Sequence, residues 1–302
     1  MDALSASPVL LVDASLYVFR AWHSIPDEFT DREGRPVNAV QGFLRFVLEL
    51  LENARPERIA IAFDESLETS FRNRLYPAYK ANREPAPESL KYQFQQCRAL
   101  CEALGLCTLA DPEFEADDLI GSLLAGIRAQ GLRGLIVSAD KDLSQLLEAG
   151  DSQWDYARNQ RWDMAGVRER YGVLARQIPD FLGLAGDAVD NIPGVPGVGA
   201  KTAAALLEHF DSLDALLARL GELPFLRIRG AASHAQRIDA HRDMALLCRE
   251  LATIRCDLDL GDAAERCRRA APDQARLDAL AEQLRLGPMT RRRIASLGST
   301  QA

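Results

Sequence analysis

No apolar run in this 302-residue sequence reaches the length that a membrane-spanning helix requires. The first residues, Met1 to Ser7, also lack the basic region and the long apolar stretch of a secretion signal. We therefore expect a cytoplasmic protein that has no membrane partner.

Cysteine and histidine are few and widely scattered. The cysteines form no CxxC pair and have no histidine at ligand spacing, so a zinc site is not expected. Thiols dispersed in this way are typical of a reduced cytoplasmic protein. The histidines, which we interpret as structural or surface residues, are His23, His209, His234 and His241.

Basic residues are outnumbered: 36 Lys and Arg stand against 44 Asp and Glu, for a net charge of −8. Taken alone, this charge argues against a protein that binds nucleic acid. The charges are unevenly distributed, however, with acids in a few clusters and cations at residues 72–83, 266–269 and 291–293. The net charge therefore lowers the expectation of nucleic-acid binding without deciding the question.

Apolar residues make up 47% of the chain, enough for a substantial core. Three short apolar runs have the length of buried strands: Val9–Val12, Ile59–Phe63 and Leu135–Val137. Helix-like stretches lie between them, at residues 40–51, 90–104 and 116–129. This alternation predicts an α/β fold in which helices cover a parallel sheet.

The second half of the sequence is different in character. A Gly/Pro-rich stretch at residues 186–199 precedes a predicted helix at 200–210, and the chain then reads as helical and polar-faced to about residue 286. We expect the last residues, 287–302, to be frayed.

Aspartates follow all three predicted strands, at the sheet edge where parallel α/β proteins place their functional sites. Further acids form short clusters in which members three apart share a helix face. Together these give nine candidate metal ligands: Asp13, Asp64, Glu115, Asp117, Asp118, Asp140, Asp142, Asp187 and Asp190.

Such a cluster has a chemical purpose if it binds metal. Packed carboxylates resist ionisation, and divalent cations remove that cost. Mg²⁺ prefers oxygen ligands, and two such ions can activate water and stabilise the leaving oxygen in phosphodiester hydrolysis. Any one acid has an ordinary explanation as a helix cap or turn former. The convergence of strand ends and paired clusters favours the metal site.

Five segments carry, in order, a resemblance to a known family. They are LLVDASLYVFRAWHS, FDESLETSFRNRLYPAYKANR, EFEADDLIGSL, VSADKDLSQLL and GDAVDNIPGVPGVGAKTAAALLEHF. The chain resembles the 5′-nuclease family, which includes the 5′–3′ exonuclease domain of bacterial DNA polymerase I, bacteriophage flap nucleases and eukaryotic flap endonucleases. The resemblance extends from about Val9 to Leu260. It implies a PIN-like 5′-nuclease fold with a helix–hairpin–helix-type element, here expected as a stand-alone protein.

The resemblance also implies two bound divalent ions, Mg²⁺ with Mn²⁺ as a substitute, and no organic cofactor. Carried over by motif, the first ligand set is Asp13, Asp64, Glu115, Asp117 and Asp118. The second set is Asp140, Asp142, Asp187 and Asp190. Every acid of the family pattern is present in this sequence.

The stretch from Glu65 to Pro87 is rich in Arg, Tyr and Pro and is long for a plain connection, which indicates a functional loop or arch. Cations interleaved with aromatic rings suit phosphates and unstacked bases, although a solvated loop explains the composition equally well. The resemblance places this stretch at the base of a helical arch. It implies that Lys80 and Arg83 contact the scissile phosphate and that Arg72 and Tyr79 belong to the DNA-binding surface. Charged Lys80 would stabilise the phosphate electrostatically.

The Gly/Pro-rich stretch resembles the family's helix–hairpin–helix element, which grips duplex DNA and in related hairpins holds a K⁺ ion. Small residues there let backbone N–H groups approach phosphate at the start of a helix. A plain turn between helices is the alternative. The DNA-binding residues that the resemblance implies here are Gly194, Gly197, Gly199, Lys201 and Thr202.

The sequence thus predicts two domains: an α/β nuclease domain at residues 1–175, with the metal site and arch, and a helical DNA-binding domain at 176–290. The expected activity is structure-selective hydrolysis of DNA at 5′ ends, overhangs and 5′ flaps, with a role in replication and repair. A metal-dependent RNase and an inactive DNA-binding module remain the alternatives.

Overall fold

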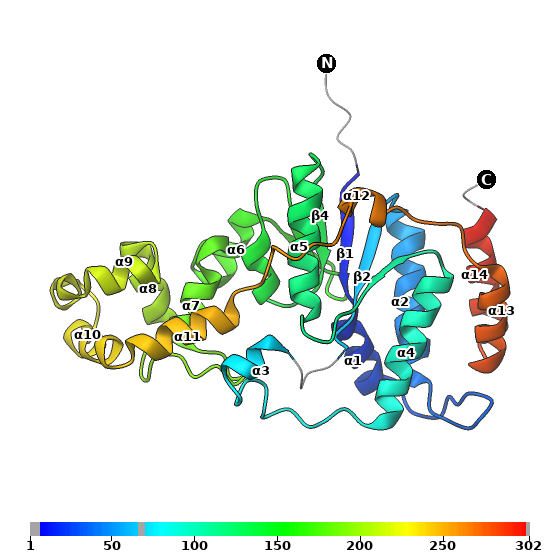
Figure 1. Ribbon diagram of the computed structural model, residues 1–302, viewed down its shortest axis with the longest axis horizontal. Coiled ribbons are helices and arrows are strands. Elements are labelled where there is room, and N and C mark those ends of the chain that lie inside the picture. The colour runs from blue at the N-terminus through cyan, green and yellow to red at the C-terminus, as the bar shows by residue number, and fades with distance from the viewer. Residues whose placement is uncertain (1–6, 66–69, 300–302) are drawn as a thin grey trace, which may run out of the picture. The chain divides into compact units, whose positions relative to one another are not determined.

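The structure is a computed structural model, which describes residues 7–65 and 70–299 (Figure 1). The chain divides into two compact units. Of the described residues, unit 1 comprises 7–65, 85–138 and 256–299, and unit 2 comprises 70–84 and 139–255. Each unit therefore contains segments that are far apart in the sequence.

Unit 1 is an α/β body. Its strands are β1 (Val9–Asp13), β2 (Ile59–Ala62), β3 (Cys107–Leu109) and β4 (Gly134–Val137). Its helices are α1 (Ala14–Ser24), α2 (Asn38–Ala54), α4 (Glu88–Ala103), α5 (Ala116–Ala129), α12 (Ala263–Arg266), α13 (Gln274–Gln283) and α14 (Pro288–Ser299).

The strands of unit 1 are parallel and lie in the order β3-β2-β1-β4. Leu10 of the central strand β1 aligns with Ile59 on one side and Leu135 on the other. Strands buried on both faces are expected to be continuously apolar, as β1, β2 and β4 are. The three predicted strands are confirmed. Strand β3 was not predicted, because its three residues, with a central Thr108, carry too little pattern.

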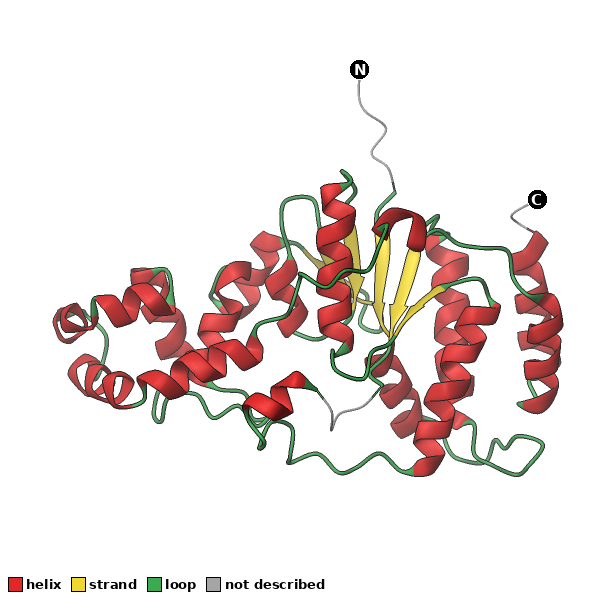
Figure 2. Cartoon of the chain, in the orientation of Figure 1, coloured by secondary structure: helices red, strands yellow, loops and turns green. Residues whose placement is uncertain are grey.

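Helices cover this sheet in layers (Figure 2). Helix α5 packs across β1, β2 and β4, while α1, α2 and α4 pack against one another. The helices predicted at residues 40–51, 90–104 and 116–129 correspond to α2, α4 and α5. The predicted α/β architecture is therefore confirmed.

Helix α2 receives its N-terminal cap from another helix. The preceding residue, Val37, offers no side-chain acceptor. Instead, Oε1 of the buried Gln93, on α4, accepts the N–H groups of Ala39 (2.7 Å) and Val40 (3.2 Å), and its amide nitrogen donates to Asn38. One buried amide thus satisfies backbone groups that would otherwise be orphaned at a helix start.

The C-terminal segment corrects an expectation. Residues 287–302 were predicted to be frayed, but residues 288–299 form helix α14, which packs on α2, while residues 300–302 lie outside the described residues. Arg293 makes a two-pronged ion pair with Glu52, and Arg291 donates to two backbone carbonyls. Ile294 and Leu297 are buried. These long-range contacts stabilise a segment whose own sequence is only weakly patterned.

Unit 2 is mostly helical, and Figure 1 labels most of its helices. Its α-helices are α3 (Phe71–Leu75), α6 (Met164–Tyr171), α7 (Ile178–Ala185), α8 (Ala200–Phe210), α9 (Leu213–Ala218), α10 (Ala231–Ala240) and α11 (Arg242–Ala252). The 3-10 helices are η1 (Asp142–Leu146), η2 (Ala175–Gln177) and η3 (Leu220–Phe225), and β5 (Ser152–Asp155) pairs antiparallel with β6 (Gln160–Trp162).

The centre of unit 2 is the close packing of α7 against α11. Gly183 permits it, since a Cβ there would meet the Ala245 carbonyl and Arg249. The helix predicted at residues 200–210 is confirmed as α8. The chain that follows, predicted to be helical to about residue 286, forms α9, η3, α10, α11, α12 and α13 with irregular segments between them.

The stretch from Glu65 to Pro87 was predicted to be a loop or arch. Residues 66–69 lie outside the described residues, and the rest contains the short helix α3 followed by turns. Within residues 7–65 and 70–299, no helix is both long enough and apolar enough to cross a bilayer.

The Gln93 cap yields a stability prediction. Gln93→Leu would leave two N–H groups of α2 buried without an acceptor, so the free energy of unfolding should fall by about 2–4 kcal/mol. Urea denaturation followed by circular dichroism measures it. The exposed neighbour Gln95, changed to Leu, is the control and should change stability little. Equal stability of the two variants would contradict the capping role.

Candidate active site

The first acid set is built on the carboxyl edge of the unit 1 sheet. Asp13 ends β1 and aligns with Ala62 at the end of β2, and Asp64 follows two residues later. The Asp64 N–H donates to the Ser15 hydroxyl at 3.0 Å. The parallel register therefore brings both aspartates to one edge, as the strand pattern predicted.

Asp13 has both of its carboxylate oxygens oriented. Oδ1 accepts the N–H of Leu16 and caps α1, while Oδ2 accepts the hydroxyl of buried Ser138, just after β4. These donors stabilise the ionised form of a carboxylate that is itself buried.

Helix α5 contributes the next acids at its N-terminus. Asp64 Oδ1 accepts the N–H of Ala116 at 2.8 Å, so Asp64 is attached to the helix start. Asp118, 0% exposed, accepts the N–H of Glu115, and the Glu115 side chain accepts a helix N–H in return. The positive end of the helix dipole favours carboxylates here. The half-buried Asp117 occupies the same first turn.

The second acid set belongs to unit 2. Asp140 Oδ1 accepts the N–H of Asp142 at 2.9 Å. Burial raises the pKa of Asp142 well above the ordinary value, and the adjacent Asp140 raises it further. Desolvation by the surrounding protein also raises the pKa of Asp140, although that residue keeps contact with solvent, while Lys80 and Lys141 oppose the rise.

A small hairpin presents Asp187 and Asp190. Its closing hydrogen bonds join the backbones of Asp187 and Ile192 in both directions. The buried Asp187 carboxylate accepts from the Lys141 ammonium at 2.5 Å. The hairpin thus holds one acid against a cation from the segment that carries Asp140 and Asp142.

The predicted phosphate-binding residues contact Asp190. Arg83 donates to its Oδ1 at 2.6 Å, the Tyr79 hydroxyl donates to Oδ2 at 3.3 Å, and the Lys80 ammonium lies 3.9 Å from Oδ2. The backbone N–H of Lys80 also donates to the backbone carbonyl of Asp190 at 2.9 Å. A carboxylate of the second set is therefore the direct partner of both cations.

Two asparagines attach the same loop to the hairpin. The Asn82 amide donates to the Ala188 carbonyl at 2.9 Å, and the Asn191 amide donates to the Ala78 carbonyl at 2.6 Å. Lys80 has a φ of 53°, a left-handed conformation that is uncommon for a side chain of this kind. The loop base is held by contacts to residues more than a hundred positions away.

Arg72 and Tyr79 lie inside unit 2. Arg72 is 2% exposed, and its guanidinium donates to the carbonyls of Leu251 and Thr253. Tyr79 is 3% exposed. In this conformation neither side chain is available to contact DNA directly, and both position the loop that bears Lys80 and Arg83.

The Gly/Pro-rich hairpin leads into α8. Gly194 has a φ of 64°, and a Cβ there would collide with the backbone of Gly186. Gly197 has a φ of 78°, and a Cβ there would collide with the Arg237 guanidinium. Gly199 precedes α8 with open space around it, Lys201 is exposed and Thr202 is half-buried. The first two glycines are required by backbone geometry and close approach.

The acids fit a hydrated divalent cation. Within residues 7–65 and 70–299, no three His, Cys, Asp or Glu side chains converge closely enough to hold an ion by themselves. Hard cations that keep several waters use only one or two carboxylates directly. Asp142 supports the fit, because its Oδ1 is buried without a hydrogen-bond partner among the described residues.

Sequence reasoning missed four residues that organise these acids: Ser138, Lys141, Asn82 and Asn191. Each lies inside one of the five motifs, so its position was a signal. The hydrogen-bond partner of each residue could not be predicted from the sequence, because every one of these contacts joins distant parts of the chain.

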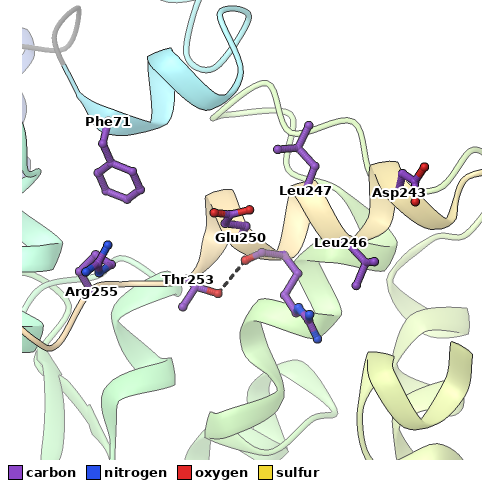
Figure 3. Close-up of a pocket in the computed structure, with 8 residues that line it drawn as sticks. Phe71, Asp243, Leu246, Leu247, Glu250, Thr253 and Arg255 are labelled. Atoms are coloured by element: carbon purple, nitrogen blue, oxygen red, sulfur yellow. Dashed lines mark hydrogen bonds between the residues drawn. The ribbon is translucent and has the colours of Figure 1, made fainter. Parts of the chain in front are cut away.

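A separate groove of about 560 Å³ runs along α11 (Figure 3). Leu246, Leu247 and Phe71 line it, and Asp243, Glu250 and Arg255 lie around it. The Thr253 hydroxyl donates to the Arg249 carbonyl beside it. None of its lining residues is among the predicted site residues, and its mixed charges indicate no single ligand.

Comparison with known proteins agrees with this architecture. Residues 8–172 match the sequence model described as 5′-3′ exonuclease, N-terminal resolvase-like domain, and residues 173–275 match 5′-3′ exonuclease, C-terminal SAM fold. The parallel sheet and the carboxylate clusters define an α/β protein whose candidate site is built from Asp and Glu side chains. Because the matched models together cover most of its length, the chain belongs to the 5′-3′ exonuclease family, and the predicted resemblance is confirmed.

Individual relatives agree. DNA polymerase I of Pseudomonas aeruginosa is 39% identical over 282 residues, which are 93% of this chain and 31% of that protein. A 5′-3′ exonuclease of Buchnera aphidicola subsp. Acyrthosiphon pisum is 33% identical over 261 residues, 86% of this chain and 91% of that protein. The chain thus spans about a third of the polymerase and nearly all of the exonuclease.

Solved structures share the fold. T5 5′-exonuclease with bound zinc ions superposes with a TM-score of 0.67 at 19% identity, covering 96% of this chain and 98% of that one. The catalytic core of Rad2 in complex with DNA substrate has a TM-score of 0.66 at 14% identity, covering 97% and 92%. At such identities the similarity establishes the fold alone.

The raised pKa of Asp142 yields a pH prediction. Its folded-state pKa lies above the unfolded value of about 3.9, so the metal-free protein should lose stability as pH rises from there through the folded pKa. Asp142→Asn cannot ionise, so in chelator at neutral pH it should melt at a higher temperature than the parent. Melting curves across pH measure this.

The exposed Asp27, changed to Asn, is the control and should follow the parent curve. If Asp142→Asn melts lower than the parent at neutral pH in chelator, the carboxylate is stabilised in the folded state and the prediction is wrong.

Proposed function

We propose that this chain is a divalent-metal-dependent 5′-nuclease that hydrolyses DNA at or near 5′ ends, overhangs and 5′ flaps, giving 5′-phosphate and 3′-hydroxyl products. The observation that carries the proposal is the direct pairing of Asp190 with Lys80 and Arg83. A metal-ligating carboxylate and two phosphate-binding cations held together are what phosphodiester hydrolysis requires.

The two acid sets bind Mg²⁺, one ion each, and Mn²⁺ substitutes. The first set is Asp13, Asp64, Glu115, Asp117 and Asp118; the second is Asp140, Asp142, Asp187 and Asp190. When bound, the ions supply an activated water at neutral pH and neutralise charge on the phosphate. Backbone donors and Ser138 orient the first set, while Lys141 orients Asp187.

Lys80 and Arg83 are the proposed catalytic cations. In the described conformation they neutralise Asp190, and a metal ion on that acid would release them toward a phosphate. Their charge then stabilises the developing negative charge of the transition state. Tyr79, through Asp190, and Arg72, through the backbone near α11, hold the loop that presents them.

The DNA itself is held by its backbone. The two acid sets carry the chemistry together with Lys80 and Arg83, and the helical part of the chain at residues 176–290 holds duplex through Gly194, Gly197, Gly199, Lys201 and Thr202, with K⁺ at the hairpin. Backbone amides and cations detect shape and charge rather than base sequence. A duplex next to a 5′ single strand uses both parts of the chain together.

The function is tested by cleavage of a matched substrate set: 5′ flap, 5′ overhang, nick, blunt duplex and single strand, in two unrelated sequences, with an RNA control. With Mg²⁺ the flap should be cut fastest in both sequences, and chelator should abolish cleavage. Asp118→Asn should lower the rate by orders of magnitude, while its amide oxygen still accepts the Glu115 N–H and preserves the helix start.

Asp111→Asn is the matched control, because Asp111 also accepts backbone N–H groups just before α5 but belongs to neither acid set. Full cleavage in chelator would exclude the metal mechanism. Faster cleavage of RNA would favour an RNase, and rates that follow sequence rather than junction would refute structure selectivity.

Lys80 should act mainly on the chemical step. Lys80→Ala is expected to lower the single-turnover rate about 100-fold while weakening DNA binding much less. Lys91→Ala removes an exposed lysine of α4 as the control. Weakened binding with an unchanged single-turnover rate would reassign Lys80 to docking.

A further inference from the structure

An exposed aromatic side chain marks a surface of unit 2 that none of the predicted site residues occupies. Phe225, at the end of η3, is 87% exposed and exceeds every other exposed large hydrophobic residue in the described chain. A single exposed apolar residue is ordinary on a protein surface. Its significance depends on what surrounds it.

The residues after Phe225 alternate in exposure. Phe225, Arg227 and Arg229 are exposed, whereas Leu226 and Ile228 are half-buried. We call residues 224–230 the Phe225 loop. Its alternation turns one aromatic ring and two guanidinium groups outward while the intervening aliphatic side chains pack inward.

The loop is held at both ends. On one side the Leu226 N–H donates to the carbonyl of the fully buried Leu223 at 3.0 Å. On the other, the Ala231 N–H donates to Ile228 at 3.1 Å, and Gly230 adopts a φ of 78° at the start of α10. Phe225 is therefore presented by a defined turn.

Positive charge on this surface is not neutralised locally. Arg227, Arg229 and Arg237 make no ion pair with any residue in the described part of the chain. The acids that flank them in sequence are paired elsewhere, Glu222 with Arg219 and Asp239 with Arg242. In a chain of net charge −8, three uncompensated arginines within eleven residues form a local positive surface. Such a surface attracts polyanions.

Helix α10 connects this surface to the Gly/Pro-rich hairpin. Arg237 lies on α10 two turns after Gly230, and its guanidinium occupies the space beside Gly197. The Phe225 loop and the hairpin are therefore joined through a single short helix. For a polyanion bound at the hairpin, the next cations are Arg237 on α10 and then Arg229 and Arg227 on the Phe225 loop.

We propose that the Phe225 loop is a second contact for the duplex part of the DNA substrate, beyond the hairpin. Arg227 and Arg229 bind backbone phosphates, and the Phe225 ring packs on the deoxyribose between them. The inference rests on the proposed function for its ligand. Exposed arginines without acidic partners favour DNA, because a cluster of uncompensated positive charge attracts a polyanion and each arginine can bind one phosphate.

Binding in chelator tests the loop separately from cleavage. Fluorescence anisotropy with duplex of about three helical turns, roughly 30 base pairs, is measured over a range of salt. Arg227→Ala with Arg229→Ala should weaken binding about tenfold and lower the salt slope by about 2, since each phosphate contact contributes about 0.9. Phe225→Ala should weaken binding severalfold with an unchanged slope. Binding to single strand should not change.

Matched controls are Arg133→Ala, an exposed arginine just before β4, and Phe29→Ala, a half-exposed aromatic of unit 1. Replacing Arg227 and Arg229 by Lys should retain the parental salt slope, because lysine keeps the positive charge. A loss of slope with Ala together with retention with Lys indicates a charge contact to phosphate rather than a structural role. If the Arg227/Arg229 alanine variant and Phe225→Ala both bind duplex with the parental affinity and salt slope, the inference is wrong, and the surface would then be one that binds a protein partner. Absence of Mg²⁺-dependent cleavage by the parent would instead contradict the proposed function, so the two failures are distinguishable.

Discussion

Mutual repulsion among clustered carboxylates is the constraint on which the rest of the site depends. Nearly every contact described around the acids offsets that repulsion, and the two sets use different donors. In the first set, backbone N–H groups, a helix N-terminus and the Ser138 hydroxyl stabilise the ionised carboxylates. In the second set, ammonium and guanidinium groups do so. Where compensation is incomplete, at Asp140 and Asp142, the pKa of the carboxyl group rises.

This difference has consequences for how each set responds to a ligand. Backbone donors at the ends of strands and helices are fixed by the fold, so the first set is preorganised whether or not an ion is present. The cations of the second set lie on side chains and on a loop, and they exchange one anionic partner for another. Asp190 is therefore both a candidate metal ligand and the residue that holds Lys80 and Arg83 when no phosphate is bound. In the proposed function, charge balance would couple metal binding at Asp190 to the release of those cations.

The contacts proposed for DNA also depend on how positive and negative charges are paired. The chain is acidic as a whole, yet cations at Lys201, on α10 and on the Phe225 loop make no ion pair with any other described residue. Glycines at the hairpin permit backbone approach where side chains would collide. An acidic protein can thus bind a polyanion, because long-range repulsion is screened within about 10 Å at ordinary salt while close contacts remain favourable.

Elements with strong local patterns could be predicted from the amino-acid sequence alone. Strands β1, β2 and β4 were readable from apolar runs, and α2, α4, α5 and α8 from their periodicity, because burial on a sheet or a helix face imposes that pattern directly. The motif order determined the family. Features that depend on long-range contacts could not be predicted in this way. Helix α14 was not predicted, because its stability comes from Glu52, some 240 positions away, and β3 was too short to recognise. Likewise, the burial of Arg72 and Tyr79 and the pairing of Asp190 with Arg83 follow from packing between distant segments, which no local pattern in the chain encodes.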